Sequence, residues 1–237
     1  MNLLAFDTST EQMSVAVQRG AVGGAIPPLL WQHSGPGGAL TSTHLIPVIQ
    51  ELMTQAGLQF SDLSAIVFGN GPGSFTGLRT ACAVAQGLAF GADLPVLPID
   101  TLLAVAEEAR FQQMPDQTTC QVLALLDARM DEVYASRYGF NAGLWTQTGG
   151  YSLTRPEDLA WDDDCTLAGN VFTAYGERLA LNAPRVAVLP TASALLRLAP
   201  ALLSAGAAVR PAQALPLYIR DKVAKTTAER VAEKALG

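Results

Sequence analysis

IVFGNGPGSFTGLRTACAVAQGLAF, residues 66–90, is the stretch that decides the fold, because it combines a strand, a glycine-rich loop and a helix. Residues 65–68 form a short apolar run with β-branched members, which is the composition of a buried strand. Glycines then interrupt the run and predict a tight turn, since glycine accepts a positive φ and lets the backbone approach another surface. These glycines are Gly69, Gly71, Gly73 and Gly77.

The glycine loop admits two interpretations. Ser74 is placed to cap the following helix, whose free N–H groups would favour an anion in the loop. The loop is therefore either a phosphate-binding loop or a plain strand-to-helix turn. Two known phosphate motifs are excluded by spacing, because no glycine lies three residues after a Gly-x-Gly pair and no lysine follows the glycines.

The helix over 77–90 is apolar on nearly every side, since only Arg79, Thr80 and Gln86 are polar. Such a helix has to be buried on nearly every side. One side can pack on its own sheet, and the small residues opposite would let another helix approach closely. We therefore expect a second subunit to cover it.

Composition and charge limit the classes of protein to consider. The 237 residues are 49% hydrophobic and 15% charged, which indicates a folded chain of one large domain or two small ones. The start lacks a secretion signal and the apolar stretches are too short to span a bilayer, so we expect no membrane contact and a cytoplasmic location. Three isolated cysteines predict reduced, buried thiols.

A net charge of −6 argues against a protein that holds nucleic acid by itself. All the lysines, Lys222, Lys225 and Lys234, lie in the C-terminal tail. The tail is either a solvated terminal helix or a segment that touches a partner or a polyanion.

The N-terminus predicts a hairpin with polar groups at its bend. A strand over 2–6 runs into Asp7, Thr8, Ser9 and Thr10, and residues 13–18 alternate as a second strand. In the actin, sugar-kinase and Hsp70 superfamily a similar strand–Asp–turn–strand unit grips phosphate and metal, usually with glycine where Ser9 stands. A plain hairpin turn is the alternative.

Residues 43–56 predict an amphipathic helix that Gly57 ends. One apolar stripe runs along it, formed by Leu45, Val48, Ile49, Leu52, Met53 and Ala56. Pro47 is tolerated only near a helix start, so the regular part should begin close to His44. The lone His33 and His44 argue against a metal site.

The second half of the chain repeats the first. Further elements are predicted as strands over 29–33, 94–99, 144–151, 166–168 and 186–189 and helices over 101–111, 168–181 and 192–206. At an offset of 120 residues, LLAFD at 3–7 matches LALLD at 123–127, each followed by a turn and another strand. We predict an α/β fold of two ribonuclease-H-like halves, each a mixed sheet flanked by helices. The halves are residues 1–100, joined by 192–237, and residues 101–191; chance similarity of two buried strands is the competing explanation.

The segments FDTST, HLIPVI, FGNGPGSFTGLR, DARMDEVY and PLYIRD together resemble the bacterial TsaB family, over residues 3–221. The resemblance implies an actin-like fold, a heterodimer with the catalytic paralogue TsaD, and an ATPase partner, TsaE. It implies a part in placing a threonylcarbamoyl group, from threonylcarbamoyl-adenylate, on the adenosine next to the anticodon of tRNAs reading codons that start with A. Contact with tRNA is expected only through the complex.

The resemblance also implies a subunit without catalytic residues or metal. The catalytic paralogue has an HxxxH metal pair after a similar loop and helix, whereas residues 98–104 here contain no histidine and none follows His44. We expect no tightly bound cofactor in the isolated chain, with ATP or ADP entering only in the complex. The turn and loop would then be remnants of a phosphate site, formed by Asp7, Thr8, Ser9, Gly69, Gly71 and Gly73.

Two classes of function therefore compete. In the first, the chain is a scaffold that contacts TsaD, or a second copy of itself when alone, through Leu45, Val48, Ile49, Leu52, Leu78, Ala81, Cys82 and Ala85. In the second, it is a small-molecule or nucleotide kinase that uses the Asp7 turn and the glycine loop. A peptidase is disfavoured, because the chain has no HExxH motif and its two histidines suggest no Ser-His-Asp set.

Overall fold

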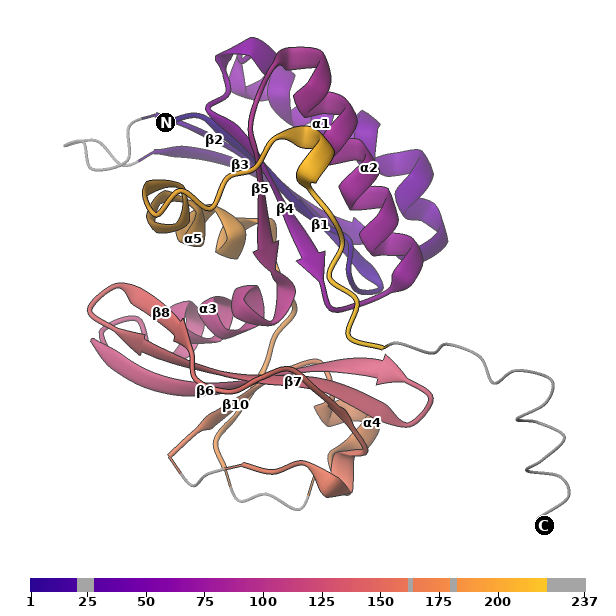
Figure 1. The fold of residues 1–237 in the computed structure, drawn as a ribbon, viewed down its shortest axis with the longest axis vertical. Helices are drawn as coiled ribbons and strands as arrows, with labels where there is room; N and C mark the ends of the chain where they lie inside the picture. The colour runs from indigo at the N-terminus through magenta and orange to yellow at the C-terminus, as the bar shows by residue number, and fades with distance from the viewer. Residues whose placement is uncertain (21–27, 162–163, 180–182, 221–237) are drawn as a thin grey trace, which may run out of the picture.

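The computed structural model describes residues 1–20, 28–161, 164–179 and 183–220. Two α/β halves lie one above the other, each built on its own mixed sheet (Figure 1). The predicted fold class is confirmed. The tail lysines and residues 180–182, the end of a predicted helix, lie outside the described residues.

The first sheet has the order β3-β2-β1-β4-β5. Its strands are β1 (Leu3–Asp7), β2 (Gln12–Arg19), β3 (Leu29–Pro36), β4 (Ala65–Gly71) and β5 (Val96–Asp100). The predicted hairpin is present as the antiparallel pair β1–β2, and β4 lies parallel to β1 on its other side. The residues that follow β1 and the loop after β4 therefore lie side by side at the carboxyl ends of these two strands.

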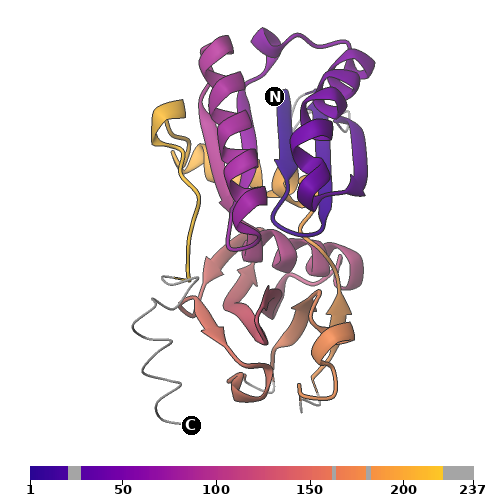
Figure 2. The ribbon, with the colours of Figure 1, turned by 90° about the vertical axis from the view of Figure 1, so that its right-hand side faces the viewer.

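Helices cover both faces of the first sheet. α1 (Thr41–Ala56) and α2 (Phe75–Ala92) pack on one face with Leu4 and Phe6, whereas α5 (Ala192–Ser204) packs on the other with Leu3 and Ala5. This division follows from the strand period of two, which sends successive side chains to opposite faces. Figure 1 shows the sheet between α5 on one side and α1 and α2 on the other, and Figure 2 looks onto the α1–α2 layer.

The helix ends agree with the caps expected from the sequence, with one difference. The Ser74 hydroxyl accepts a hydrogen bond from the Gly77 N–H at 3.5 Å, and α1 ends at Gly57 in the left-handed region. α1 begins at Thr41 rather than near His44, because the 3-10 turn η1 (Gly38–Leu40) leads directly into it. Pro47 consequently lies inside the helix.

The second sheet has the order β11-β10-β6-β7-β8, with β9 also paired to β7. Its strands are β6 (Thr119–Arg129), β7 (Glu132–Asn141), β8 (Leu144–Gln147), β9 (Ser152–Thr154), β10 (Thr166–Gly169) and β11 (Arg185–Ala187). The antiparallel β6–β7 pair, with the parallel β10 beside β6, repeats the arrangement of β1, β2 and β4. The internal repeat seen in the sequence is therefore a structural repeat.

α3 (Thr101–Gln113) lies between the two sheets and contacts β6, β4 and α5. Its buried Glu107 accepts hydrogen bonds from Arg110, Arg197 of α5 and the Trp145 indole. Arg197 also pairs with Glu108 at 2.6 Å, so these ion pairs hold α3 and α5 together. This buried polar cluster forms the inner side of the junction between the halves.

The remaining elements are short: η2 (Phe60–Asp62), η3 (Pro156–Asp158), α4 (Phe172–Tyr175) and η4 (Pro211–Gln213). The prediction of a helix from Ala168 towards Leu181 is wrong for the described residues, because α4 spans one turn and residues 168–169 end β10. Cys82 and Cys165 are buried free thiols and Cys120 is half-buried. No helix among the described residues is both long and apolar enough for a bilayer.

Candidate functional site at the cleft between the halves

Asp7 ends β1 as a buried carboxylate. The backbone N–H and the hydroxyl of Ser9 both donate to its Oδ1, at 2.9 and 2.6 Å. Its Oδ2 has no hydrogen-bond partner within the described part of the chain. Burial raises the pKa of Asp7 to about 6, although the two bonds from Ser9 oppose the shift. The carboxylate is therefore held by its own turn in a dry environment.

The glycine loop packs directly against this turn. A Cβ on Gly69 would lie 1.8 Å from Asp7 Oδ2, and a Cβ on Gly77 would lie 1.8 Å from the Thr8 carbonyl oxygen. A Cβ on Gly73 would likewise lie 2.5 Å from the Ser9 carbonyl oxygen. The glycines are thus needed for close approach of one part of the chain to another.

The predicted phosphate-site residues are therefore brought together, but mostly against one another. Ser9 and Gly73 line the cleft between the halves, whereas Asp7, Thr8, Gly69 and Gly71 do not. At Gly71, where φ is +122°, a Cβ would lie 2.5 Å from the Leu217 carbonyl oxygen. Gly69 faces the Asp7 carboxylate and Gly71 faces the Leu217 backbone, so both glycines pack against the chain itself rather than against the cleft.

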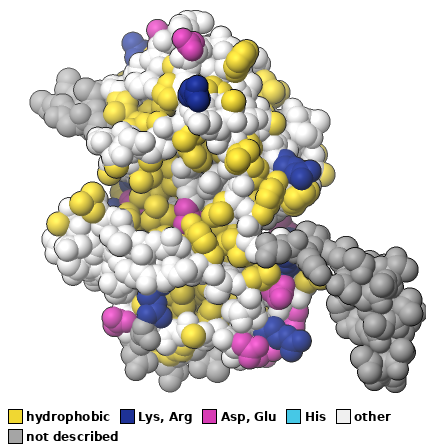
Figure 3. Space-filling model, in the orientation of Figure 1, with side chains coloured by type: hydrophobic (Ala, Val, Ile, Leu, Met, Phe, Trp, Pro, Cys, Tyr) yellow, Lys and Arg dark blue, Asp and Glu magenta, His cyan; other side chains and the backbone are white. Residues whose placement is uncertain are grey.

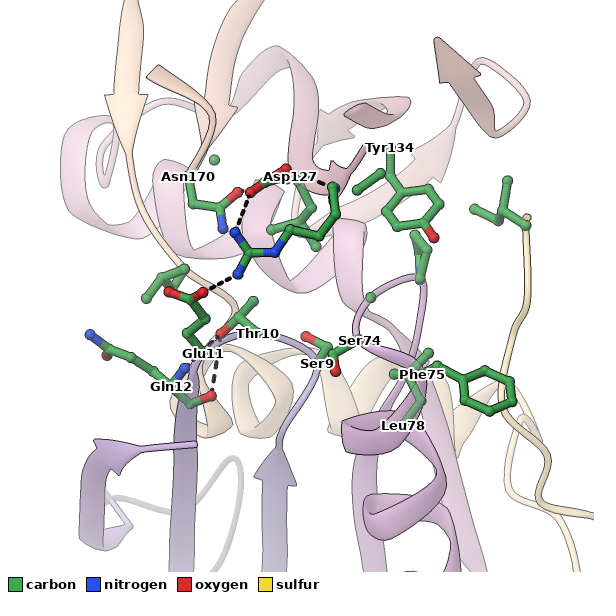
Figure 4. A pocket seen from close by; sticks show the side chains of 18 of the residues that line it. Ser9, Thr10, Glu11, Gln12, Ser74, Phe75, Leu78, Asp127, Tyr134 and Asn170 are labelled. Atoms are coloured by element: carbon green, nitrogen blue, oxygen red, sulfur yellow. Dashed lines mark hydrogen bonds and ion pairs between the residues drawn. The ribbon is translucent and has the colours of Figure 1, made fainter. Parts of the chain in front are cut away.

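The cleft itself has a volume of about 1060 Å³ and is lined from both halves. Figure 4 shows residues of the β1–β2 turn and the start of α2 on one side, with Asp127, Tyr134 and Asn170 on the other. The cleft is therefore a large concave site, and of the two repeated aspartates only Asp127 lines it.

Asp127, the counterpart of Asp7, is fully engaged. Its Oδ2 pairs with Arg129 Nη1 at 3.1 Å and its Oδ1 accepts from the Tyr175 hydroxyl at 3.0 Å. Arg129 also pairs with Glu11 across the cleft, as Figure 4 shows. Neither aspartate of the repeat presents an unpaired carboxylate to the cleft, and the described residues contain no cluster of three metal-ligating side chains.

The predicted contact residues on α1 and α2 need a correction. Six of the eight are core residues of the first half, namely Leu45, Ile49, Leu52, Ala81, Cys82 and Ala85. Leu78 is also buried but lies at the wall of the cleft, and Val48 is only partly buried. The continuous apolar stripe faces the chain's own sheet, because that sheet needs the same apolar cover as a partner would. A partner therefore cannot touch these six core side chains in this arrangement.

The outer face of α2 is the surface that a partner can reach. Residues four apart along it are exposed, namely Phe75, Arg79, Ala83 and Gly87, and the Phe90 side chain is 83% exposed. A Cβ on Gly87 or Gly91 would have no atom within 4 Å. Their spacing of four residues is visible in the sequence and is the signal that identifies this face.

Other residues of the site were not predicted as such. Glu11, Arg129 and Arg220 meet at the cleft although they are far apart in the chain. Arg129 belongs to the DARMDEVY segment, and its position beside the repeated aspartate was the available signal.

Comparisons with known proteins found one matching family model, relatives similar in sequence and solved structures of similar fold. The model of the family described as TsaD, tRNA N6-adenosine threonylcarbamoyltransferase, matches residues 33–166. A protein of Escherichia coli K12, named tRNA threonylcarbamoyladenosine biosynthesis protein TsaB, is 31% identical over 94% of this chain and 96% of its own. The Haemophilus influenzae protein of the same name is 34% identical over 94% of this chain and 95% of its own. The structure of YeaZ from Pseudomonas aeruginosa matches with a TM-score of 0.80 and 38% identity, over 92% of this chain and 99% of that one.

Proposed function

The chain belongs to the TsaB family of tRNA threonylcarbamoyladenosine biosynthesis proteins, and we propose that it serves this pathway as a non-catalytic subunit that docks on TsaD. The docking surface is the outer face of α2, formed by Phe75, Arg79, Ala83, Gly87 and Phe90 with Gly91. The same face would pair two copies of the chain when TsaD is missing.

The observation that carries this proposal is the pair of glycines on that face. Neither Gly87 nor Gly91 has a positive φ, and neither lies near another part of the chain. Glycine costs about 1 kcal/mol relative to alanine inside a helix, so the fold of this chain alone gives no reason for either. Small residues four apart allow a second helix to approach closely, and the exposed Phe90 beside them would then be covered.

The apolar character of this region supports a protein partner. Ile46 of α1, on the same side of the sheet, is 44% exposed, and Phe75 is 47% exposed. Figure 3 shows hydrophobic side chains exposed over the first half and where the two halves meet. Contiguous exposed apolar side chains are typical of protein interfaces.

The non-catalytic part of the proposal is supported by the state of the repeated aspartates. Asp7 is buried against Gly69, and Asp127 is neutralised by Arg129. Residues 98–104, which by the resemblance correspond to the metal-binding stretch of the catalytic paralogue, contain no histidine. This subunit would therefore supply a surface, while the subunit bound to it supplies the reaction.

Size-exclusion chromatography and calorimetry with purified TsaD test the docking surface. Gly87→Arg places a long cation where two helices would meet and should weaken the complex at least tenfold, because an unpaired buried charge is costly. Thr146→Arg adds the same side chain to the exposed strand β8 of the other half and should leave binding unchanged. Wild-type affinity for Gly87→Arg would exclude the α2 face, and a wild-type monomer that ignores TsaD would exclude the scaffold.

We make the same proposal for nucleotide and for the other partners. The isolated chain holds no cofactor tightly, ATP or ADP enters in the complex, TsaE joins that complex, and tRNA is reached through it. Calorimetry of the isolated chain with magnesium and ATP separates this from the kinase alternative. Tight magnesium-dependent binding with hydrolysis would favour the kinase.

A further inference from the structure

The segment that follows α5, residues 207–220, runs from the first half to the second, and we call it the strap. In Figure 1 it leaves α5, crosses the front of the first half and descends beside α2, and in Figure 2 it descends along the left-hand edge. On the inner side, β5 leads directly into α3, and β11 is followed by α5, which packs on the first sheet. The strap is thus a further connection, separate from this inner junction.

Most of the strap is bound to the first half. Val209 exchanges two backbone hydrogen bonds with Val96 of β5, at 2.8 and 2.9 Å. The Ala214 carbonyl oxygen accepts from Gln86 of α2 at 2.9 Å, and the Leu217 N–H donates to the Asn70 carbonyl oxygen at 2.7 Å. These contacts hold the strap on β5, on α2 and on the glycine loop.

Tyr218 fixes the last point of contact with the first half. Its ring lies 5.3 Å from that of Phe75, and its hydroxyl accepts from Arg79 Nε at 3.0 Å. The Arg79 guanidinium lies 3.8 Å from the centre of the Phe75 ring. An aromatic pair with a cation over one face is a favourable contact even at the surface.

The next two residues belong to the second half. Ile219 packs against the hydrophobic core under β6 and β7. Arg220 pairs with the Glu132 carboxylate and also donates to the Arg129 carbonyl oxygen at 3.4 Å. The Arg220 side chain is only 13% exposed, so this contact is shielded from solvent more than a surface ion pair is. The strap therefore ends on the turn between β6 and β7.

That turn is strained. Arg129, Met130 and Asp131 are consecutive residues with φ of 61°, 55° and 66°, a conformation that costs non-glycine residues about 1 kcal/mol each. Such a turn persists only where its surroundings hold it. Arg220 binds one end of it through the Arg129 carbonyl and Glu132, and the same turn carries the Arg129 side chain to Glu11 across the cleft.

We propose that the strap is a latch: Arg220, by holding the strained β6–β7 turn, keeps the two halves closed over the cleft. Loss of the Arg220–Glu132 pair frees the turn, weakens the Arg129–Glu11 bridge and lets the second half move about the inner junction formed by α3 and α5. The strap touches α2 at Gln86 and Arg79, and Tyr218 stacks on Phe75, so the strap adjoins the proposed docking face, whereas Arg220 and Glu132 of the latch are not part of that face.

Hydrogen–deuterium exchange and small-angle X-ray scattering of the full chain test the latch. In Arg220→Ala, amides over 127–134 and 214–220 should exchange about tenfold faster, as expected for loss of a charge-assisted hydrogen bond, and the radius of gyration should increase. α1 and α5 should keep wild-type exchange. Arg210→Ala is the matched control, because Arg210 lies on the same strap and bonds to Gln213 within its own turn.

The charge-reversed pair Arg220→Glu with Glu132→Arg should restore slow exchange and the smaller radius. Three outcomes would overturn the proposal: Arg220→Ala behaving like Arg210→Ala, faster exchange confined to the strap itself, or faster exchange throughout the chain including α1 and α5. The last would show general destabilisation rather than a latch.

Discussion

Replacing Asp7 with asparagine should remove the pH dependence that this one carboxylate gives to stability. Asp7 is buried, and its pKa of about 6 lies well above the ordinary value of 3.8. Each pKa unit is worth about 1.4 kcal/mol, so the buried charge costs the folded state about 3 kcal/mol at neutral pH. The asparagine keeps an oxygen that can accept both hydrogen bonds from Ser9.

The sign follows from which state binds the proton more tightly. The folded state does so here, because its pKa is raised, and the contribution of Asp7 to stability is fully present below pH 3.8. It is lost as the pH rises towards 6 and above. Asp7→Asn removes this loss, so the variant should gain stability over the wild type by up to about 3 kcal/mol between pH 4 and pH 7.

Denaturant unfolding of both proteins at several pH values between 4 and 7.5 measures this difference. The free energies of unfolding should diverge as the pH rises. Ser9→Ala is a second check, because it removes the hydroxyl bond that lowers the pKa of Asp7. In this variant the free energy of unfolding should fall more between low and neutral pH than in the wild type. Parallel profiles for wild type and Asp7→Asn would refute the argument that burial dominates at this turn.

Two further substitutions test packing within the first half, at Gly69, and the polar cluster between α3 and α5, at Glu107. Gly69→Ala should cost about 3 kcal/mol of unfolding free energy, because its Cβ would lie 1.8 Å from Asp7 Oδ2, whereas Gly150→Ala meets open space and should be nearly neutral; equal effects would contradict the close packing. Glu107→Gln should cost about 2–4 kcal/mol at pH 7, because Arg110 loses its carboxylate partner while Arg197 keeps only Glu108. Burial raises the pKa of Glu107, but hydrogen bonds led by that from Arg110 outweigh it and lower the pKa. The wild type should therefore lose its advantage as the pH falls below 4.5, and a pH-independent difference in urea unfolding would count against this.

The local elements could be predicted from the sequence because their signals are local. Ser74 and Gly57 mark helix ends through bonds within a few residues, and both act as expected. The repeat of a strand ending in aspartate identified two similar halves, because a buried strand followed by a turn has the same composition in each. The short extent of α4 escaped prediction, since helix propensity alone does not determine where tertiary contacts end a helix.

The assignment of helix faces shows where the pattern stops being informative. Periodicity shows that α1 and α2 have apolar sides, but an apolar side fits the chain's own sheet as well as a partner. Only the structure shows that Leu45 and Ala81 are core residues and that Gly87 and Phe90 face outward. Which side of each helix is buried depends on the helix surface that the sheet covers, and that surface is set by the packing of β1, β2 and β4 together.

The sequence by itself therefore determined most of the elements, the duplicated strand–Asp–turn–strand unit and the lack of an HxxxH pair, because each depends on neighbouring residues or on residue types. Only the tertiary structure decided what the polar groups of the repeated unit contact. The glycine loop after β4 is packed on Asp7, and the cleft is bridged by Glu11 with Arg129 and bounded by Arg220. Those contacts join residues as much as 118 positions apart, and their energies depend on burial and distance, which no local pattern contains.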